Sequence, residues 1–139
     1  MVALVCMVML NSCLADDKMI APEQLPETAK TFITAQFPDN PVLLAQKDAD
    51  FTKTKYEVTL KDGTEIDFDK KGEWDKVDCK MNAIPAALLP QAIATYVETN
   101  FPDMVVVKID KERNGYEIKL SNDLDLTFNA SGMLIEMDD

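Results

Sequence analysis

The sequence LPETAKTFITAQFPD at residues 25–39 returns as LPQAIATYVETNFPD at residues 89–103, displaced by a constant 64 positions. Further along, YEVTLKDGTEIDFDKKG at residues 56–72 matches YEIKLSNDLDLTFNASG at residues 116–132 with a displacement of 60. Self-similarity at a fixed spacing indicates that the chain contains two copies of one structural unit. Because 64 exceeds 60 by four, the first copy carries four extra residues between its matched segments.

Each copy begins with an amphipathic helix. Apolar residues recur at positions i, i+4, i+7, i+8 and i+12 of the 25–39 and 89–103 segments, which places them on one helical face. A proline stands in the first turn and another follows the end of each helix: Pro26 and Pro38, then Pro90 and Pro102. The second copy has an additional Pro85, so we expect residues 84–89 to form a separate turn.

After each helix the apolar period changes to two, which is typical of half-buried antiparallel strands. Tyr56, Val58 and Leu60 alternate with polar residues, and Asp62-Gly63 marks a hairpin turn. Strands are expected near residues 42–49, 56–60, 65–69 and 74–79, and again near 105–109, 115–121, 124–128 and 133–137. The sequence therefore predicts an α+β fold of two αββββ repeats that share one antiparallel sheet of about eight strands, with both helices on one face.

A single repeat of about 60 residues would bury too little apolar surface to be stable alone. We therefore expect repeat 1, at residues 16–80, and repeat 2, at residues 81–139, to form one domain with a shared core.

The first ten residues, MVALVCMVML, are uninterruptedly apolar and precede small and polar residues. This run is typical of an export signal and is too short to cross a bilayer as a helix. Residues 1–15 are therefore assigned to an export signal, with either ordinary cleavage after Ala15 or lipidation of Cys13 in the sequence LNSC. We expect a periplasmic mature chain without an integral membrane segment. Its one cysteine, Cys79, is expected to be a buried packing residue.

Composition excludes several classes of function. Lys and Arg number 14 against 25 Asp and Glu, so the formal net charge is −11 and the surface would repel nucleic acid. The sequence contains no histidine, which removes Ser-His-Asp and Cys-His catalytic arrangements and the commonest zinc ligand. A hydrolase that uses two carboxylates is the least favoured class. We predict no catalytic residue, no cofactor and no metal.

Acidic residues of the predicted strands form the main candidate partner surface. By strand alternation they should project from the sheet face opposite the helices, where they could steer a basic partner; the alternative is a solvated face that keeps the protein soluble. These residues are Glu57, Glu65, Asp67 and Asp69 of repeat 1, with Glu117, Asp123 and Asp125 of repeat 2.

Two aromatic positions are further candidates. The four-residue excess lies in residues 48–55 and places Asp50 and Phe51 near a hairpin tip, where an aromatic could anchor a partner or the length could simply vary. Trp74 is matched by Leu134 in repeat 2, which favours a packing role over an interfacial one.

The segment from Asp67 to Gly72, with Asp78 at the twelfth place, has part of the spacing of a calcium-binding loop. Its fifth position is Lys71, a cation, and Phe68 suits a strand. We therefore favour an ordinary hairpin over a calcium loop.

Together these features resemble the tandem PepSY-like periplasmic proteins of Gram-negative bacteria. The resemblance rests on the leader that runs into Ala-Asp-Asp-Lys, the Leu-Pro to Phe-Pro helices, the Tyr-Glu-Val and Tyr-Glu-Ile strands, DGTEIDFD at residues 62–69 and GEWDKVD at residues 72–78. It implies a fold similar to that of beta-lactamase-inhibitor proteins and a binding or inhibitory role without enzyme activity. It brings no established site residues.

The predicted function is thus an exported, non-enzymatic module that binds an unknown protein of the cell envelope, with a hydrolase or peptidase as a target for inhibition. The alternative is a small-ligand binding protein or a binding protein that acts in the envelope stress response.

Overall fold

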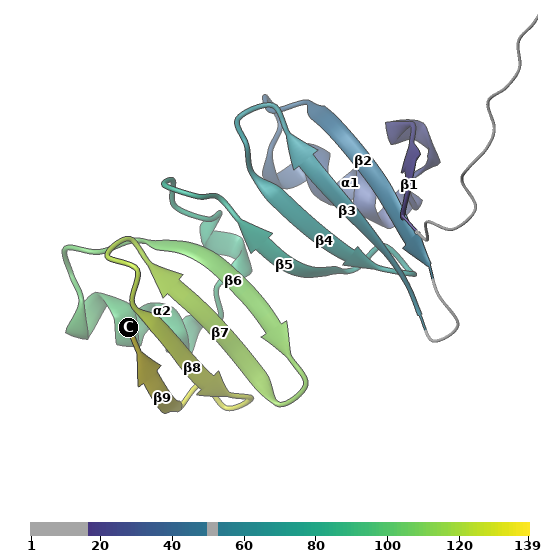
Figure 1. The fold of residues 1–139 in the computed structure, drawn as a ribbon. Coiled ribbons are helices and arrows are strands. Elements are labelled where there is room, and N and C mark those ends of the chain that lie inside the picture. The colour runs from purple at the N-terminus through teal and green to yellow at the C-terminus, as the bar shows by residue number, and fades with distance from the viewer. Residues whose placement is uncertain (1–16, 50–52) are drawn as a thin grey trace, which may run out of the picture.

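The computed structural model describes residues 17–49 and 53–139. Within them, nine antiparallel strands form a single sheet in chain order, each strand hydrogen-bonded to the next (Figure 1). The elements are β1 (Asp17–Ile20), η1 (Pro22–Gln24), α1 (Glu27–Gln36), β2 (Val42–Ala49), β3 (Thr54–Leu60), β4 (Glu65–Asp69), β5 (Trp74–Asp78), η2 (Ala86–Leu88), α2 (Gln91–Asn100), β6 (Val106–Glu112), β7 (Gly115–Leu120), β8 (Asp125–Asn129) and β9 (Leu134–Asp138).

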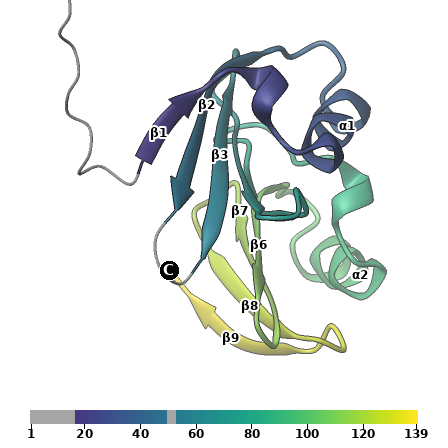
Figure 2. The same ribbon diagram turned by 90° about the vertical axis from the view of Figure 1, so that its right-hand side faces the viewer.

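Both helices lie on the same side of the sheet, as the sequence predicted (Figure 2). The edge strands β1 and β9 lie farther from the helices than the central strands do, so the sheet bows away from the helices at its two ends. We call the sheet face opposite α1 and α2 the open face. No helix among the described residues is long and apolar enough to cross a membrane.

The sheet has nine strands rather than the predicted eight, because the strand β1 was missed. Its four residues pair with β2 from Asp17 opposite Asp48 to Ile20 opposite Ala45. Ile20 packs against the core, whereas Lys18 and Met19 are exposed. A segment this short does not show the alternation by which strands are recognised. The αββββ order is otherwise found in both repeats. The separate turn predicted around residues 84–89 is η2.

The two helices pack in equivalent ways. α1 buries Ala29 and Ile33 and α2 buries Ile93 and Val97, one turn apart in each case. In repeat 1 the ring of Phe32 meets Phe68 edge-on at 5.7 Å, and in repeat 2 Tyr96 meets Phe128 at 5.5 Å. These aromatic pairs attach each helix to the strand beneath it.

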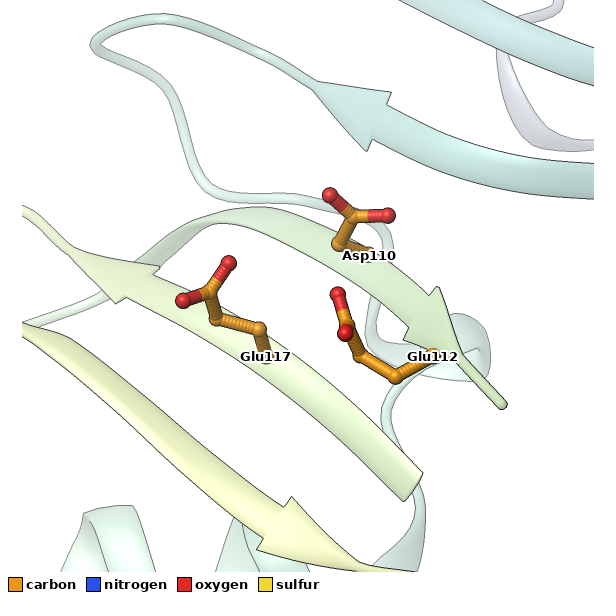
Figure 3. A group of neighbouring side chains, drawn as sticks. All are labelled: Asp110, Glu112 and Glu117. Carbon is orange, nitrogen blue, oxygen red and sulfur yellow. The ribbon is translucent and has the colours of Figure 1, made fainter. Parts of the chain in front are cut away.

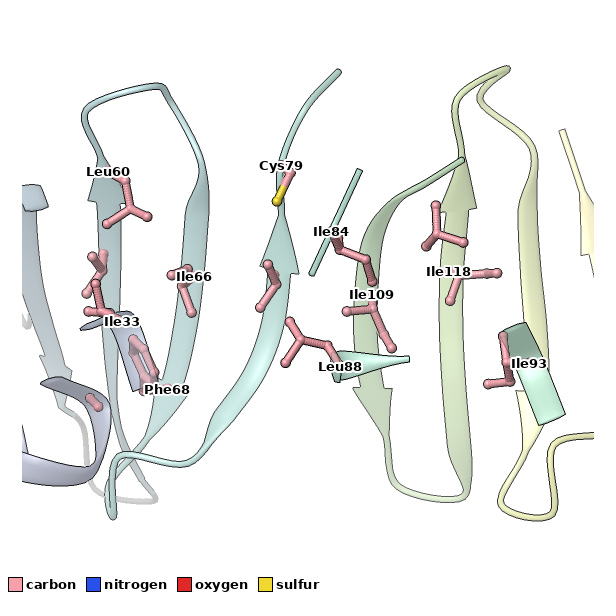
Figure 4. Close-up of a cluster of buried hydrophobic side chains, with 14 of the residues drawn as sticks. Ile33, Leu60, Ile66, Phe68, Cys79, Ile84, Leu88, Ile93, Ile109 and Ile118 are labelled. Atoms are coloured by element: carbon pink, nitrogen blue, oxygen red, sulfur yellow. The ribbon is translucent and has the colours of Figure 1, made fainter. Parts of the chain in front are cut away.

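β5 and β6 join the repeats. Val77 pairs with Ile109, and both are fully buried. The buried Cys79, Ile84 and Leu88 extend the same core across the junction (Figure 4). Backbone bonds from Cys79 N to Val107 O at 2.8 Å and from Ile84 N to Val106 O at 2.9 Å continue the contact beyond β5. Cys79 is a buried packing residue as predicted, and burial raises the pKa of its thiol.

A glycine turn lies against each helix. Gly72, between β4 and β5, has a φ of 88°, and a Cβ placed there would lie 2.9 Å from both Ala29 N and Pro26 Cβ of the α1 start. Gly132 repeats the arrangement beneath α2, where a Cβ would lie 2.5 Å from Ala92 Cβ. Gly63, in the turn between β3 and β4, has a φ of 96° but nothing within 4 Å of its Cβ position.

These turns give a test of helix seating. We expect Gly72→Ala to destabilise the protein by about 1–3 kcal/mol more than Gly63→Ala, because both substitutions strain a left-handed backbone but only the first forces α1 to move. Denaturant unfolding of the two variants measures the difference. Equal losses of unfolding free energy would mean that α1 yields to the extra methyl group without cost.

Candidate functional site

The open face carries a continuous row of polar side chains. In register across seven strands stand Glu57, Asp67, Lys76, Asp110, Glu117, Thr127 and Glu136. We call this the central row. Its members from β3 to β8 each adjoin a buried residue, such as Val58 or Ile66, that points toward the helices. Since successive strand residues point to opposite faces, the central row lies on the open face.

A second row runs parallel to the first on the same face. It consists of Thr59, Glu65, Asp78, Lys108, Lys119, Asp125 and Asp138. Both rows cross from repeat 1 to repeat 2 without interruption, because Lys76 pairs with Asp110 and Asp78 pairs with Lys108. The open face is therefore one surface built by both repeats.

Lysines neutralise most of the repeat 1 carboxylates on this face. The ion pairs are Lys55 with Glu57 at 3.0 Å, Lys76 with Asp67 at 3.9 Å, Lys80 with Glu65 at 3.1 Å and Lys80 with Asp78 at 3.4 Å. In repeat 2, Lys119 pairs with Asp125 at 3.0 Å. Exposed pairs of this kind contribute little to stability, about 0–1 kcal/mol each, so they mainly shape the surface charge.

Repeat 2 contributes a cluster of three carboxylates, Asp110, Glu112 and Glu117, which we call the acidic triad (Figure 3). One carboxylate oxygen from each residue lies within 4.8 Å of the others. Glu112 is exposed, whereas Asp110 and Glu117 are half-buried. Burial and the neighbouring carboxylates, of which Asp125 acts most strongly, raise the pKa of Glu117. Concentrated negative charge of this kind attracts a cation.

Sequence reasoning missed Asp110 and Glu112. It ended their strand near residue 109, whereas β6 continues to Glu112. The repeat contained the missing signal, since β2 continues to Ala49 and a displacement of 64 carries the equivalent strand beyond residue 109.

The structure places most of the predicted acidic residues on the open face. Glu57, Asp67 and Glu117 stand in the central row, and Glu65 and Asp125 stand in the second row. Asp123 differs from the expectation: it has a φ of 71° in the turn between β7 and β8, outside the strands. Strand alternation therefore does not apply to it.

Asp69 also stands on the open face, in register with Lys55, but its carboxylate has a structural task. It accepts hydrogen bonds from the backbone N–H of Lys71 at 2.8 Å and of Glu73 at 3.0 Å. In repeat 2, Asn129 accepts the equivalent bonds from Ser131 and Met133. The segment with partial calcium-loop spacing thus forms the hairpin that the sequence favoured.

Trp74 is not brought together with the acidic residues. Its ring lies 6.3 Å from that of Phe32 in α1, on the helix side of the sheet, and Lys111 Nζ lies 4.1 Å from the ring centre. This is a packing position with a cation–π contact. Asp50 and Phe51 lie outside the described residues.

The small-ligand alternative needs an apolar pocket, which usually measures about 300–1,000 Å³. A hollow of about 200 Å³ lies between η1, α1 and β2, lined in part by Leu25, Ile33 and Val42. A larger hollow of about 590 Å³ beyond the end of α1 is wide open to solvent and is lined by Phe37 and Pro38 together with Asp39, Asn40, Lys61 and Asp62. Neither hollow is both large and enclosed, as a typical small-ligand site is.

Comparison with known proteins gives one family. The family model described as "Putative beta-lactamase-inhibitor-like, PepSY-like" matches the chain twice, at residues 14–61 and 54–136. A search of curated protein sequences found no significant match.

Solved structures are similar over most of the chain. A periplasmic protein of Bacteroides thetaiotaomicron, provisionally described as calcium-regulated, is 44% identical with a TM-score of 0.85, covering 89% of this chain and 98% of its own. A periplasmic protein of Bacteroides vulgatus is 43% identical with a TM-score of 0.86, covering 91% and 99%. A second from that species, of unknown function, is 35% identical with a TM-score of 0.85, covering 88% and 99%.

The open face should make stability depend on pH. Burial is the main cause that raises the pKa of Asp67, of Asp75 and of Glu117 above their ordinary values. The folded protein therefore holds these protons more tightly than the unfolded chain does. The contribution of these three carboxyls to the free energy of unfolding should rise as the pH falls from 7 through their raised folded-state pKa values toward the ordinary values of 3.8 for Asp and 4.5 for Glu. The rise should end once the unfolded carboxyls are also protonated.

Glu117→Gln tests this directly. Because Glu117 stands opposite Asp110, removing its charge should raise the melting temperature at pH 7 by about 1–4 °C and reduce the gain on acidification. Glu98→Gln, an exposed change on α2, is the matched control and should leave both quantities unchanged. Thermal unfolding of the parent and the variants across this pH range measures the effect. If the melting temperature of Glu117→Gln depends on pH as that of the parent does, the Glu117 carboxyl is not a source of the pH dependence.

Proposed function

We propose that this chain, which belongs to the beta-lactamase-inhibitor-like, PepSY-like family, is a periplasmic protein-binding module without catalytic activity. The similar structures are described as periplasmic proteins, which supports that location. Its binding surface is the open face, and its partner presents a basic surface to the central row.

The observation that carries this proposal is the uncovered acidic sheet face shared by both repeats. Its central row holds five carboxylates, at Glu57, Asp67, Asp110, Glu117 and Glu136, against one lysine at position 76. With a formal net charge of −11 for the whole chain, such a face attracts a positively charged partner before contact and orients it. Complementary charge of this kind favours fast association and selects against acidic competitors.

A binding role fits these carboxylates better than catalysis does. Acid–base catalysis on a sugar requires two carboxyls in a cleft that separates their pKa values. Here the carboxylates stand on an uncovered sheet, several of them in ion pairs with lysine. The absence of histidine from the sequence removes the commonest general base as well.

We further propose that the partner is an exported hydrolase or peptidase and that binding inhibits it. The support is the family description, which compares these proteins with a beta-lactamase inhibitor. A bowed sheet with its helices behind it offers a broad surface that could cover the entrance of an active site (Figure 2).

Calcium binding at the acidic triad is a second candidate function. The observation that favours it is the approach of three carboxylate oxygens to within 4.8 Å, in a chain 44% identical to a protein provisionally described as calcium-regulated. Calcium takes six to eight oxygen ligands, and three carboxylates can supply up to six of them. An exposed site of this kind should be weak, with a Kd of about 10⁻⁴–10⁻³ M as in extracellular modules.

Charge neutralisation tests the open face. A partner purified from the envelope of the source organism with the mature chain as bait should associate about 3–10-fold more slowly with the Asp67→Asn, Asp69→Asn variant. The salt dependence of its association rate should also flatten. The fold tolerates this variant, because Asn129 already makes the bonds of Asp69 in repeat 2.

The matched control removes two carboxylates from exposed positions outside the strands, with Glu23→Gln and Glu98→Gln. Its association rate should equal that of the parent chain. If both pairs of substitutions slow association equally, net charge rather than the open face governs encounter. If neither changes the rate, the partner binds elsewhere. Activity of a partner hydrolase or peptidase, titrated with the parent chain, tests inhibition separately.

Calorimetric titration with calcium chloride tests the second function. We expect the Asp110→Asn, Glu117→Gln variant to bind calcium at least tenfold more weakly than the parent, whereas Glu57→Gln with Asp67→Asn, on the same row in repeat 1, should change the affinity little. At ten times Kd, calcium should add about 1.4 kcal/mol to the unfolding free energy of the parent. If both variants bind calcium equally more weakly than the parent, the ion is attracted by the general negative charge of the face rather than by the acidic triad. If calcium produces no heat of binding with the parent chain, the site is rejected.

A further inference from the structure

The strand β9 is the repeat 2 equivalent of β5, but the two strands have different surroundings. A displacement of 60 relates Leu134–Asp138 to Trp74–Asp78. β5 pairs with β4 on one side and with β6 on the other. Within the described residues, β9 pairs with β8 alone and forms an edge of the sheet (Figure 1).

The edge leaves a core position uncovered. Met137 occupies the place of Val77, which is 0% exposed because Ile109 and the adjoining core cover it. Met137 is 49% exposed. In repeat 1, therefore, the equivalent position is covered by a neighbouring strand that places the apolar Ile109 directly opposite Val77.

Two more apolar residues on this edge are not required by the fold. Met133 is 65% exposed and Ile135 is 63% exposed, and they stand in the places of Glu73 and Asp75. Repeat 1 forms the same hairpin with acidic residues at both places, and both are exposed. Since the strand forms without them, the apolar side chains of β9 indicate a contact outside the repeat.

The pairing of β5 with β6 shows what such a contact would look like. Opposite Lys76, Val77 and Asp78 stand Asp110, Ile109 and Lys108, so charges are complementary on the open face and apolar residues meet on the core side. The corresponding residues of β9 are Glu136, Met137 and Asp138. Their complement is a cation, an apolar residue and a second cation.

A second copy of this chain fits poorly, because its own β9 would bring Glu136 and Asp138 toward the same acidic residues. The register shift in β9 is no obstacle to pairing. It lies between Thr127 and Phe128 of the partner strand, and β5 has the equivalent shift opposite Asp67 and Phe68 yet still pairs with β6.

We propose that the outer edge of β9 accepts an extended segment of a partner protein in which Lys or Arg alternates with apolar residues. The segment adds a tenth strand, placing its cations beside Glu136 and Asp138 and an apolar side chain over Met137. This inference rests on the proposed protein-binding role. The contact is made along the outer edge of β9, whose Glu136 and Asp138 are also the last members of the two open-face rows.

The test uses the ¹⁵N-labelled mature chain and the capped peptide Thr-Lys-Ile-Lys-Ile-Lys-Thr. At saturation we expect shift changes centred on Leu134–Asp138 and at least tenfold slower hydrogen exchange of β9 amides. Ile135→Lys with Met137→Lys should weaken peptide binding at least tenfold. Met19→Lys is the control at the other sheet edge, where Met19 is 58% exposed, and it should leave binding unchanged.

A peptide of the same composition, Thr-Lys-Lys-Ile-Ile-Lys-Thr, keeps the charge but breaks the alternation, and it should bind at least tenfold more weakly. Equal binding of both peptides, shift changes confined to β3 and β4, or no binding of either peptide would overturn strand addition without touching the open-face proposal. Conversely, normal partner association by the Asp67→Asn, Asp69→Asn variant rejects the open face and leaves β9 standing. A dimer in sedimentation velocity that Met137→Lys dissociates would make a second copy the occupant and overturn the partner segment.

Discussion

The pairing of β5 with β6 is the interaction on which the rest of the molecule depends. It consists of three register pairs, of which Val77 with Ile109 is fully buried and the two flanking pairs are oppositely charged. This junction converts two small αββββ units, each with a partly covered sheet, into one core that includes residues of both repeats. It also fixes the register of repeat 2 relative to repeat 1, so the central row continues across the junction at Lys76 and Asp110.

Once the register is fixed, the repeats differ mainly in charge. In repeat 1 the open-face carboxylates Glu57 and Asp67 have lysine partners within 3.0–3.9 Å. In repeat 2, Asp110 and Glu117 stand opposite each other, and Glu112 lies beside them. The same scaffold thus presents carboxylates that are mostly in ion pairs with lysine on one half, and a cluster of three neighbouring carboxylates on the other. A fold alone does not specify function, and this asymmetry of side chains is the feature from which binding must be argued.

The features that could be predicted from sequence are those that repeat. Helix spacing, strand alternation and the displacements of 64 and 60 gave the α+β order, the shared sheet and the open-face position of residues such as Glu57 and Asp67. The acidic triad was missed because it depends on pairing between β6 and β7, and a strand end misplaced by three residues removed Asp110 and Glu112. The match of Trp74 with Leu134 predicted its packing role, although strand alternation alone could not have assigned its side, because a bulge in β5 interrupts the alternation.

The two edge strands of the sheet, β1 and β9, relate to the repeat in different ways. β1 covers the outer side of β2 as β5 covers the outer side of β6: Ile20 stands opposite Ala45, and Val77 stands opposite Ile109, the residue 64 positions beyond Ala45. β1 thus reproduces the register of β5 with only four residues, and at this edge it supplies the neighbour that a preceding repeat would supply. Among the described residues, no strand covers the outer side of β9. The strand and the turn before it expose Met133, Ile135 and Met137, whereas the equivalent positions of repeat 1 hold two acidic residues and the buried Val77. An edge that repeats the pattern of an internal strand, with apolar residues in place of acidic ones, is suited to a neighbour from another molecule.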